Sequence, residues 1–95
     1  MFKVSDGKGF QMTFSNGWTV SVQWGVGNYC AVNHRWTPYE SVEIVDRTVG
    51  AEGSATAEIA AWDANNVWYQ FPADTVKGYC TPDEVADFIK MISAM

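Results

Sequence analysis

The fold is decided between residues 10 and 24, which read Phe10-Gln11-Met12-Thr13-Phe14-Ser15-Asn16-Gly17-Trp18-Thr19-Val20-Ser21-Val22-Gln23-Trp24. Apolar and polar residues alternate on both sides of Ser15-Asn16-Gly17, which is typical of two half-buried strands joined by a turn. A two-residue Asn-Gly loop would set apolar residues against polar ones on both faces of the pair. A three-residue loop ending at Gly17 keeps every apolar residue on one side, and glycine suits its left-handed last position. The predicted pairs are Phe10 with Val22, Met12 with Val20 and Phe14 with Trp18.

A second hairpin is predicted between residues 56 and 71, around the turn Asp63-Ala64-Asn65-Asn66. A three-residue loop over 64–66 sets Trp62 opposite Trp68 on one face of the strands. On the other face it pairs Ile59 with Phe71 and Ala61 with Tyr69. Asn66 tolerates the left-handed position that such a loop needs. Propensity alone would also allow a helix over the alanine-rich residues 55–61, but the tight connection to a clear strand favours the hairpin.

The rest of the chain adds one strand and one helix. Residues 41–46 are predicted to form a strand that extends towards Thr48, and residues 50–54 a turn. The segment Thr81-Pro82-Asp83-Glu84 has the cap, the proline and the glutamate of a capping box, so a helix begins there. Its apolar stripe is Val85, Phe88, Ile89 and Ile92. We predict one α+β domain over residues 1–95: an antiparallel sheet of four to five strands (two hairpins) with one C-terminal helix packed on it.

Charge is distributed unevenly along the chain. Residues 1–39 hold three basic residues and one acidic residue, and residues 40–95 hold three basic and ten acidic residues, for a net charge of −5. An acidic protein repels the nucleic-acid backbone, so a nucleic-acid polymer is disfavoured as a partner. No apolar run is long enough to span a bilayer, and residues 1–7 lack a signal-peptide pattern. We therefore expect a cytoplasmic protein without a membrane partner.

No residue pattern indicates catalysis or metal binding. His34 is the only histidine and lies in a polar, aromatic loop, where a solvated role is usual. Cys30 and Cys80 are expected to be free thiols that act as small buried residues. Gly25-Val26-Gly27 lacks the third glycine and the helix of a dinucleotide-binding fingerprint. We expect no enzymatic activity, no catalytic residue, no metal site and no cofactor.

The aromatic residues divide into two groups. The predicted core face takes Phe10, Phe14, Trp18, Tyr69, Phe71 and Phe88. Trp62 and Trp68 fall on the opposite face, and Trp36 and Tyr39 lie in a loop with His34 and Arg35. Exposed tryptophans beside an arginine suit stacking on a planar ligand or a protein contact. The alternative is a second small core on that face, covered by residues 25–39 or by a second subunit.

Three segments resemble a family of small, mostly uncharacterised proteins of tailed phages and prophages. They are residues 16–30 (NGWTVSVQWGVGNYC), 57–63 (AEIAAWD) and 74–85 (DTVKGYCTPDEV). Residues 31–54 match nothing in that family. The resemblance implies a bacteriophage protein made in the cytoplasm of a bacterial host, where small phage proteins often serve as accessory or counter-defence factors that act by binding. It implies no chemical mechanism.

The leading hypothesis is therefore sequestration of a small nucleotide-like immune signal, by the chain alone or as a homo-oligomer. Trp36, Trp62 or Trp68 would stack on the base, and Arg35 with Lys77 or Arg47 would meet the phosphate. The predicted ligand-binding residues are Asn28, Tyr29, His34, Arg35, Trp36, Trp62, Trp68 and Lys77. One alternative is an acidic inhibitor that binds a host defence protein through residues 40–95 and the exposed tryptophans. Another is a small structural or assembly component.

Overall fold

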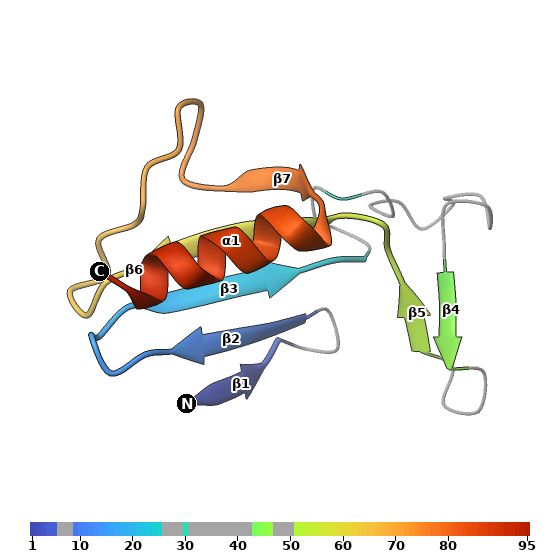
Figure 1. Cartoon of the computed structure of the whole chain (residues 1–95), viewed down its shortest axis with the longest axis horizontal. Coiled ribbons are helices and arrows are strands. Elements are labelled where there is room, and N and C mark those ends of the chain that lie inside the picture. The colour runs from blue at the N-terminus through green and yellow to red at the C-terminus, as the bar shows by residue number, and fades with distance from the viewer. Residues whose placement is uncertain (6–8, 26–29, 31–42, 47–50) are drawn as a thin grey trace.

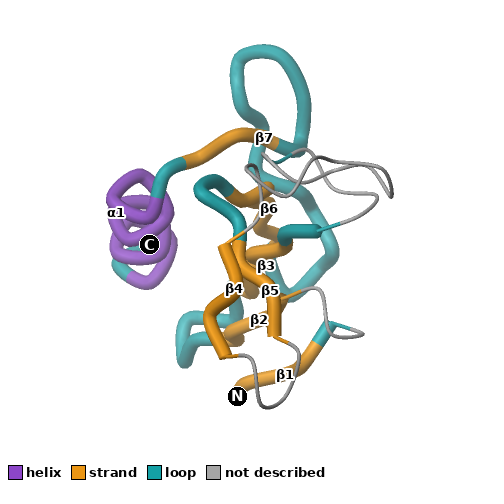
Figure 2. The backbone as a smooth tube through the Cα atoms, turned by 90° about the vertical axis from the view of Figure 1, so that its right-hand side faces the viewer, coloured by secondary structure: helices purple, strands orange, loops and turns teal. Residues whose placement is uncertain are grey.

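The computed structural model describes residues 1–5, 9–25, 30, 43–46 and 51–95. Five antiparallel strands form one sheet in the order β1-β2-β3-β6-β7. The strands are β1 (Phe2–Val4), β2 (Gly9–Thr13), β3 (Thr19–Gln23), β6 (Ala57–Trp62) and β7 (Lys77–Cys80). Helix α1 (Pro82–Ser93) lies against β3 and β6 on one side of the sheet (Figures 1 and 2). The predicted α+β fold is confirmed.

Strands β2 and β3 form the first predicted hairpin in the predicted register. The pairs Phe10–Val22 and Met12–Val20 both form. The Phe14 N–H donates to the Trp18 carbonyl at 2.8 Å, and the Gly17 N–H donates to the Phe14 carbonyl at 3.0 Å. Gly17 takes a φ of 89°, which is the left-handed conformation expected of it. Alternation of apolar residues and one turn glycine are therefore enough to set this register.

The second predicted hairpin forms only close to its turn. Trp62 lies opposite Trp68 in a single antiparallel bridge, and the Tyr69 N–H donates to the Ala61 carbonyl at 2.8 Å. Asn66 takes a φ of 61°, as the three-residue loop requires. The prediction of a continuous strand over 67–71 is wrong, because only Trp68 makes a bridge there. The alternative of a helix over 55–61 is excluded, since residues 57–62 form β6.

Packing explains why the chain leaves the sheet after Trp68. The rings of Tyr69 and Phe71 lie against Phe88 of α1, with centroid distances of 5.5 and 5.3 Å. Pro72 comes next and has no N–H to continue a ladder. Strand β7 pairs with β6 instead, so that Ile59 lies opposite Lys77 and not opposite Phe71.

A separate two-stranded antiparallel sheet is formed by β4 (Glu43–Asp46) and β5 (Ala51–Gly53). The strand predicted over 41–46 is confirmed for residues 43–46, and its flanking residues 41–42 and 47–48 lie outside the described residues. The turn predicted over 50–54 is wrong for residues 51–53, because their backbone pairs with β4. Gly53, which belongs to the predicted turn, lies at the end of β5 opposite Glu43.

The main core lies between α1 and the sheet. Its buried residues are Val20, Val22, Ala57, Ile59, Ala61, Phe71, Cys80, Phe88 and Ile92. The aromatic residues predicted for this face all belong to it, because Phe10, Phe14, Trp18 and Tyr69 pack against the same cluster. The predicted helix stripe is confirmed too, with Phe88 and Ile92 buried and Val85 and Ile89 half-buried. Within the described ranges, no helix combines the length and the apolarity needed to cross a membrane.

Both ends of α1 are fixed by side chains. At its start, the Glu84 N–H donates to Thr81 Oγ1 at 3.2 Å and the Thr81 N–H donates to Glu84 Oε1 at 3.0 Å, which confirms the predicted capping box. At its end, Asn16 Nδ2 donates to the carbonyl oxygens of Ile92 at 2.9 Å and Met95 at 3.1 Å. The turn of the first hairpin is thereby tied to the last turn of the helix.

Candidate functional site

A pair of tryptophans lies at the turn after β6, and one of its rings is exposed to solvent. The ring centroids of Trp62 and Trp68 are 4.9 Å apart, and the ring planes are tilted by 33°. Trp62 is half-buried, whereas Trp68 is 45% exposed and its neighbour Val67 is 59% exposed. The two adjoining rings therefore form an apolar surface that is exposed at Trp68, and we call Trp62 and Trp68 the tryptophan surface.

The turn that carries this surface is held by Asp63. Its Oδ1 accepts hydrogen bonds from the Asn65 N–H at 2.8 Å and from the Val67 N–H at 3.0 Å. Backbone bonds also close the turn, from the Asp63 N–H to the Val67 carbonyl and from the Asn66 N–H to the Asp63 carbonyl, both at 3.0 Å. Asp63 thus acts as a turn residue, as expected of an aspartate there, and it fixes the backbone from Asp63 to Val67.

Alternate residues after the turn point in opposite directions. Tyr69 and Phe71 contact each other at 5.0 Å and both contact Phe88, so they anchor the segment to α1. Trp68, between Val67 and Tyr69, is left on the other side of the sheet with Trp62. The burial of the two anchoring rings is therefore what holds Trp68 outside the main core.

The middle of the helix-free face is not open surface. Thr19, Ser21 and Ala60 lie on this face and are all buried, although none of them belongs to the main core. Thr13 Oγ1 and Thr19 Oγ1 share a hydrogen bond of 2.9 Å next to Trp62, which pairs with Thr19. This face therefore has a buried centre of small side chains and an exposed end that carries the tryptophan surface. Residues 26–29 and 31–39, which the sequence suggested as a cover, lie outside the described residues.

Lys77 is not brought to the tryptophan surface. It lies opposite Ile59, whose side chain is in the core beneath α1, and residues paired across a ladder share a face. Its Nζ lies 3.7 Å from Glu84 Oε2 at the start of the helix. Trp62, three residues after Ile59, points to the opposite face. Of the eight predicted ligand-binding residues, the structure therefore joins Trp62 and Trp68 and places Lys77 elsewhere.

The other predicted ligand-binding residues lie outside the described residues. They are Asn28, Tyr29, His34, Arg35 and Trp36, and the same holds for Tyr39 and Arg47. Val67, by contrast, is an exposed residue that sequence reasoning passed over. Alternation assigns Val67 to the side of Tyr69, so the sequence carried no signal for its exposure.

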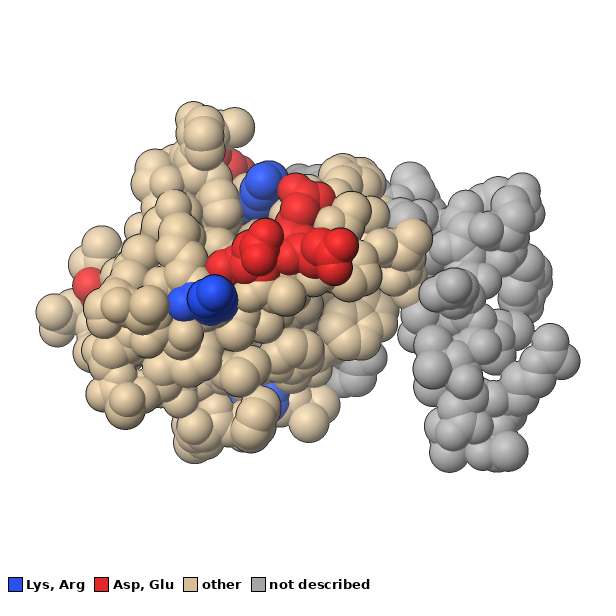
Figure 3. Space-filling model, in the orientation of Figure 1, with Lys and Arg blue, Asp and Glu red and all other residues tan. Residues whose placement is uncertain are grey.

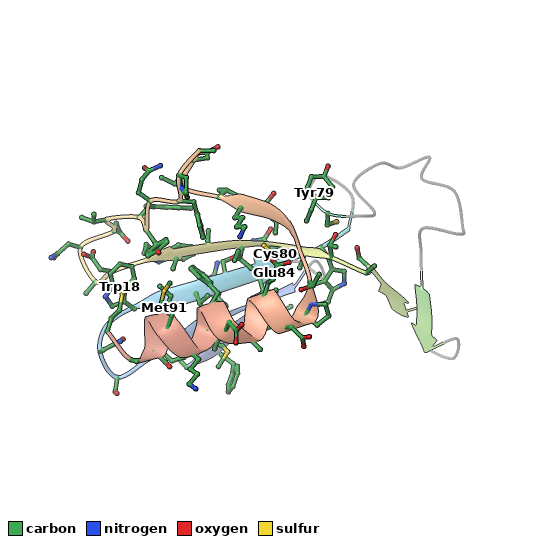
Figure 4. The ribbon with its side chains drawn as sticks, turned by 45° about the horizontal axis from the view of Figure 1, so that its top comes forward. Trp18, Tyr79, Cys80, Glu84 and Met91 are labelled. Atoms are coloured by element: carbon green, nitrogen blue, oxygen red, sulfur yellow. The ribbon has the colours of Figure 1, made fainter. Side chains whose placement is uncertain are left out.

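Two ionisable groups near the start of α1 have shifted pKa values, the Cys80 thiol and the Glu84 carboxyl. Cys30 and Cys80 are both buried. Burial raises the pKa of the Cys80 thiol, and this effect exceeds the opposing attraction of Lys77. Hydrogen bonds from Thr81 lower the pKa of Glu84, which lies near Cys80 at the start of α1 (Figure 4). No group of three metal-ligating side chains occurs within the described residues.

Acidic side chains gather over the first turns of α1 (Figure 3), whereas Trp62 lies on the face of the sheet without the helix. They are Asp83, Glu84 and Asp87, and the first two stabilise the positive end of the helix dipole. On the face of the sheet that carries Trp62, Glu58 lies in β6 opposite Gln23, while the Asp63 carboxylate is bonded to the backbone of the turn. A flat partner cannot touch both groups at once, so the acidic helix and the tryptophans form two separate surfaces.

Comparison with known proteins identified no relative of this chain. No family model, no curated protein and no solved structure matches the chain.

Proposed function

We propose that this protein acts by binding another protein, with the tryptophan surface as the central contact. The observation that carries the proposal is the exposure of Trp68, whose ring rests on Trp62 beside a turn fixed by Asp63. Tryptophan is enriched among the residues that dominate protein–protein binding energies. A contact residue on a fixed backbone loses little conformational freedom on binding, which increases affinity.

The charges near the tryptophan surface favour a protein over a nucleotide. The basic side chains that the structure describes are Lys3, Lys77 and Lys90. Lys77 and Lys90 belong to the helix side of the molecule, and Lys3 lies three strands away from Trp62, roughly 14 Å at ordinary strand spacing. A stacked base would therefore lack a described basic side chain close by for its phosphate. Sequestration of a nucleotide-like ligand stays a prediction that depends on Arg35 and Arg47.

The proposal is compatible with the phage resemblance. In that setting the protein would be a counter-defence factor that occludes a host defence protein in the bacterial cytoplasm. Asp63 lies in the turn that carries the tryptophan surface, Glu58 lies further along the same face of β6, and the chain carries a net charge of −5. A partner with a basic rim around an apolar pocket would match this surface, and its association rate would fall as salt is added.

Substitution of Trp68 by alanine tests the proposal directly. We expect Trp68→Ala to weaken the partner complex about 30-fold or more, as loss of a dominant contact residue does. The thermal midpoint should change little, because Trp68 is largely outside the core. Partners would be captured from a bacterial lysate by wild type, Trp68→Ala and the control Tyr79→Ala, which removes another exposed aromatic ring, and then measured by calorimetry with the purified protein.

Three results would overturn the proposal. The first is a partner that binds wild type and Trp68→Ala equally well. The second is a large drop in the stability of Trp68→Ala, which would assign the ring to packing. The third is stabilisation of the wild type by a cyclic nucleotide that is lost in Trp68→Ala, which would restore the nucleotide hypothesis.

A further inference from the structure

The free edge of β1 presents unpaired backbone groups between exposed apolar side chains. Strand β1 has β2 on one side and no strand on the other within the described residues. Backbone hydrogen bonds to β2 join the Thr13 N–H to the Met1 carbonyl at 2.8 Å and the Ser5 N–H to the Gly9 carbonyl at 3.1 Å. In an antiparallel pair the direction of bonding alternates, so the N–H and C=O groups of Phe2 and Val4 point outward.

The side chains of Phe2 and Val4 continue the apolar side of the sheet beyond the helix. They pair with Met12 and Phe10, which are half-buried against the core, but they are themselves 77% and 74% exposed. Helix α1 lies against β3 and β6 and leaves β1 uncovered (Figure 1). An exposed edge strand with apolar side chains is a template for pairing with another strand.

Lys3 decides which strand fits this edge. In an antiparallel pair of two β1 strands centred on this residue, Phe2 would face Val4 of the second copy and the two Lys3 side chains would lie directly opposite each other. Like charges at opposite positions destabilise a sheet, and lysine on an edge strand is a recognised protection against self-pairing. The same position favours a strand with a carboxylate at its centre.

We propose that the β1 edge binds an extended segment of a partner protein with the pattern apolar–acidic–apolar. The segment adds an antiparallel strand, whose backbone bonds to Phe2 and Val4 and whose carboxylate lies opposite Lys3. This is strand addition, in which the main chain supplies affinity and alternate side chains supply specificity. The site is independent of the tryptophan surface, because β2 and β3 separate β1 from β6.

Two labelled peptides probe the site. Both are capped decapeptides of alternating threonine and valine, with Val-Glu-Val at the centre of one and Val-Lys-Val at the centre of the other. We expect the glutamate peptide to bind about tenfold more tightly to the wild type, from the difference between an opposite-charge and a like-charge cross-strand pair. Fluorescence anisotropy measures the affinities, and amide NMR shifts should be largest at Phe2 and Val4. Lys3→Glu should reverse the preference.

A matched pair of variants isolates the backbone contact. Val4→Pro removes an N–H that points outward, so the bonds between β1 and β2 remain, and proline is tolerated on an edge strand. Val4→Ala removes most of the same side chain and keeps the N–H. We expect peptide binding to be lost in Val4→Pro and only weakened in Val4→Ala, while both variants keep the circular dichroism spectrum of the wild type.

The proposal is overturned if the two peptides bind equally, or if Val4→Pro binds as well as Val4→Ala. A wild-type dimer that dissociates in Val4→Pro would also overturn it and would assign the edge to a second copy of the chain. Trp68→Ala should bind the glutamate peptide like the wild type. Failure here therefore leaves the proposed function untouched.

Discussion

Asn16 connects residues that are far apart in the sequence. Its Oδ1 accepts from the Trp18 N–H at 2.9 Å within the hairpin turn, and its Nδ2 donates to carbonyl oxygens at the end of α1. The last carbonyls of a helix lack partners within the helix and carry its negative partial charge. One amide side chain thus serves the turn as an acceptor and the helix as a donor, a combination that an ionised aspartate cannot provide.

Asn16→Asp should therefore destabilise the protein more than Asn16→Ala. The carboxylate can still accept from Trp18, but it would face the negative end of the helix in place of a donor. We expect about 1–3 kcal/mol of lost unfolding free energy for aspartate, as for a partly exposed group left without its partner, and about 1 kcal/mol for alanine. Urea unfolding at neutral pH measures both. Equal losses for the two variants would contradict the expected repulsion between the carboxylate and the negative end of the helix.

At the scale of elements, the start of α1 links stability to pH. Hydrogen bonds from Thr81, with help from Lys77, lower the pKa of Glu84 below its ordinary value of 4.5. A carboxyl with a lowered pKa in the folded state stabilises that state when ionised. Its contribution is present above the ordinary pKa and is lost as the pH falls through the folded value.

Glu84→Gln separates the charge from the hydrogen bond. Glutamine can still accept from the Thr81 N–H, so the cap geometry is kept while the titration is removed. We expect the stability advantage of wild type over Glu84→Gln to shrink between about pH 7 and about pH 3. Urea unfolding at both pH values gives the difference. An advantage that grows at low pH would contradict the direction of the pKa shift.

The elements also show how far the sequence predicts the structure. The first hairpin was predicted in full, because both strands alternate and Gly17 fixes the turn. The second was predicted only near its turn, because the path after Trp68 depends on the contact of Tyr69 and Phe71 with the distant Phe88. Strand β7 contains Gly78 and a positive φ at Tyr79, so its sequence carries no alternation to read. The tryptophan pair followed from register alone, whereas the position of Lys77 depended on a strand that was not predicted.

At the scale of the whole molecule, one helix covers one part of one sheet. Phe88 lies at the centre of that contact, where it is buried against Tyr69 and Phe71. A chain of this length has about 5–15 kcal/mol of unfolding free energy, so a single large core side chain is a sizeable fraction of the total.

Phe88→Ala should remove about 3–5 kcal/mol of unfolding free energy, through lost burial and the cavity that remains. The loss would also free the segment that holds Trp68 outside the core. Met91→Ala, which truncates a helix side chain that is 40% exposed, is the control and should cost less than about 1 kcal/mol. Chemical denaturation measures both variants. A similar small loss in both would show that the helix is not needed to stabilise the sheet.

The pairing of β3 with β6 has a consequence for how this chain can vary. Gln23 lies opposite Glu58, so the two ends of the intervening segment are neighbours in an antiparallel ladder. Where the structure describes that segment, it forms the separate β4–β5 sheet and no strand of the main one. The free-energy cost of closing a loop changes by only about 0.6 kcal/mol for each doubling of its length. The main sheet can therefore tolerate changes in the length of this interval. Natural variants are therefore expected to differ most in length and sequence within this interval.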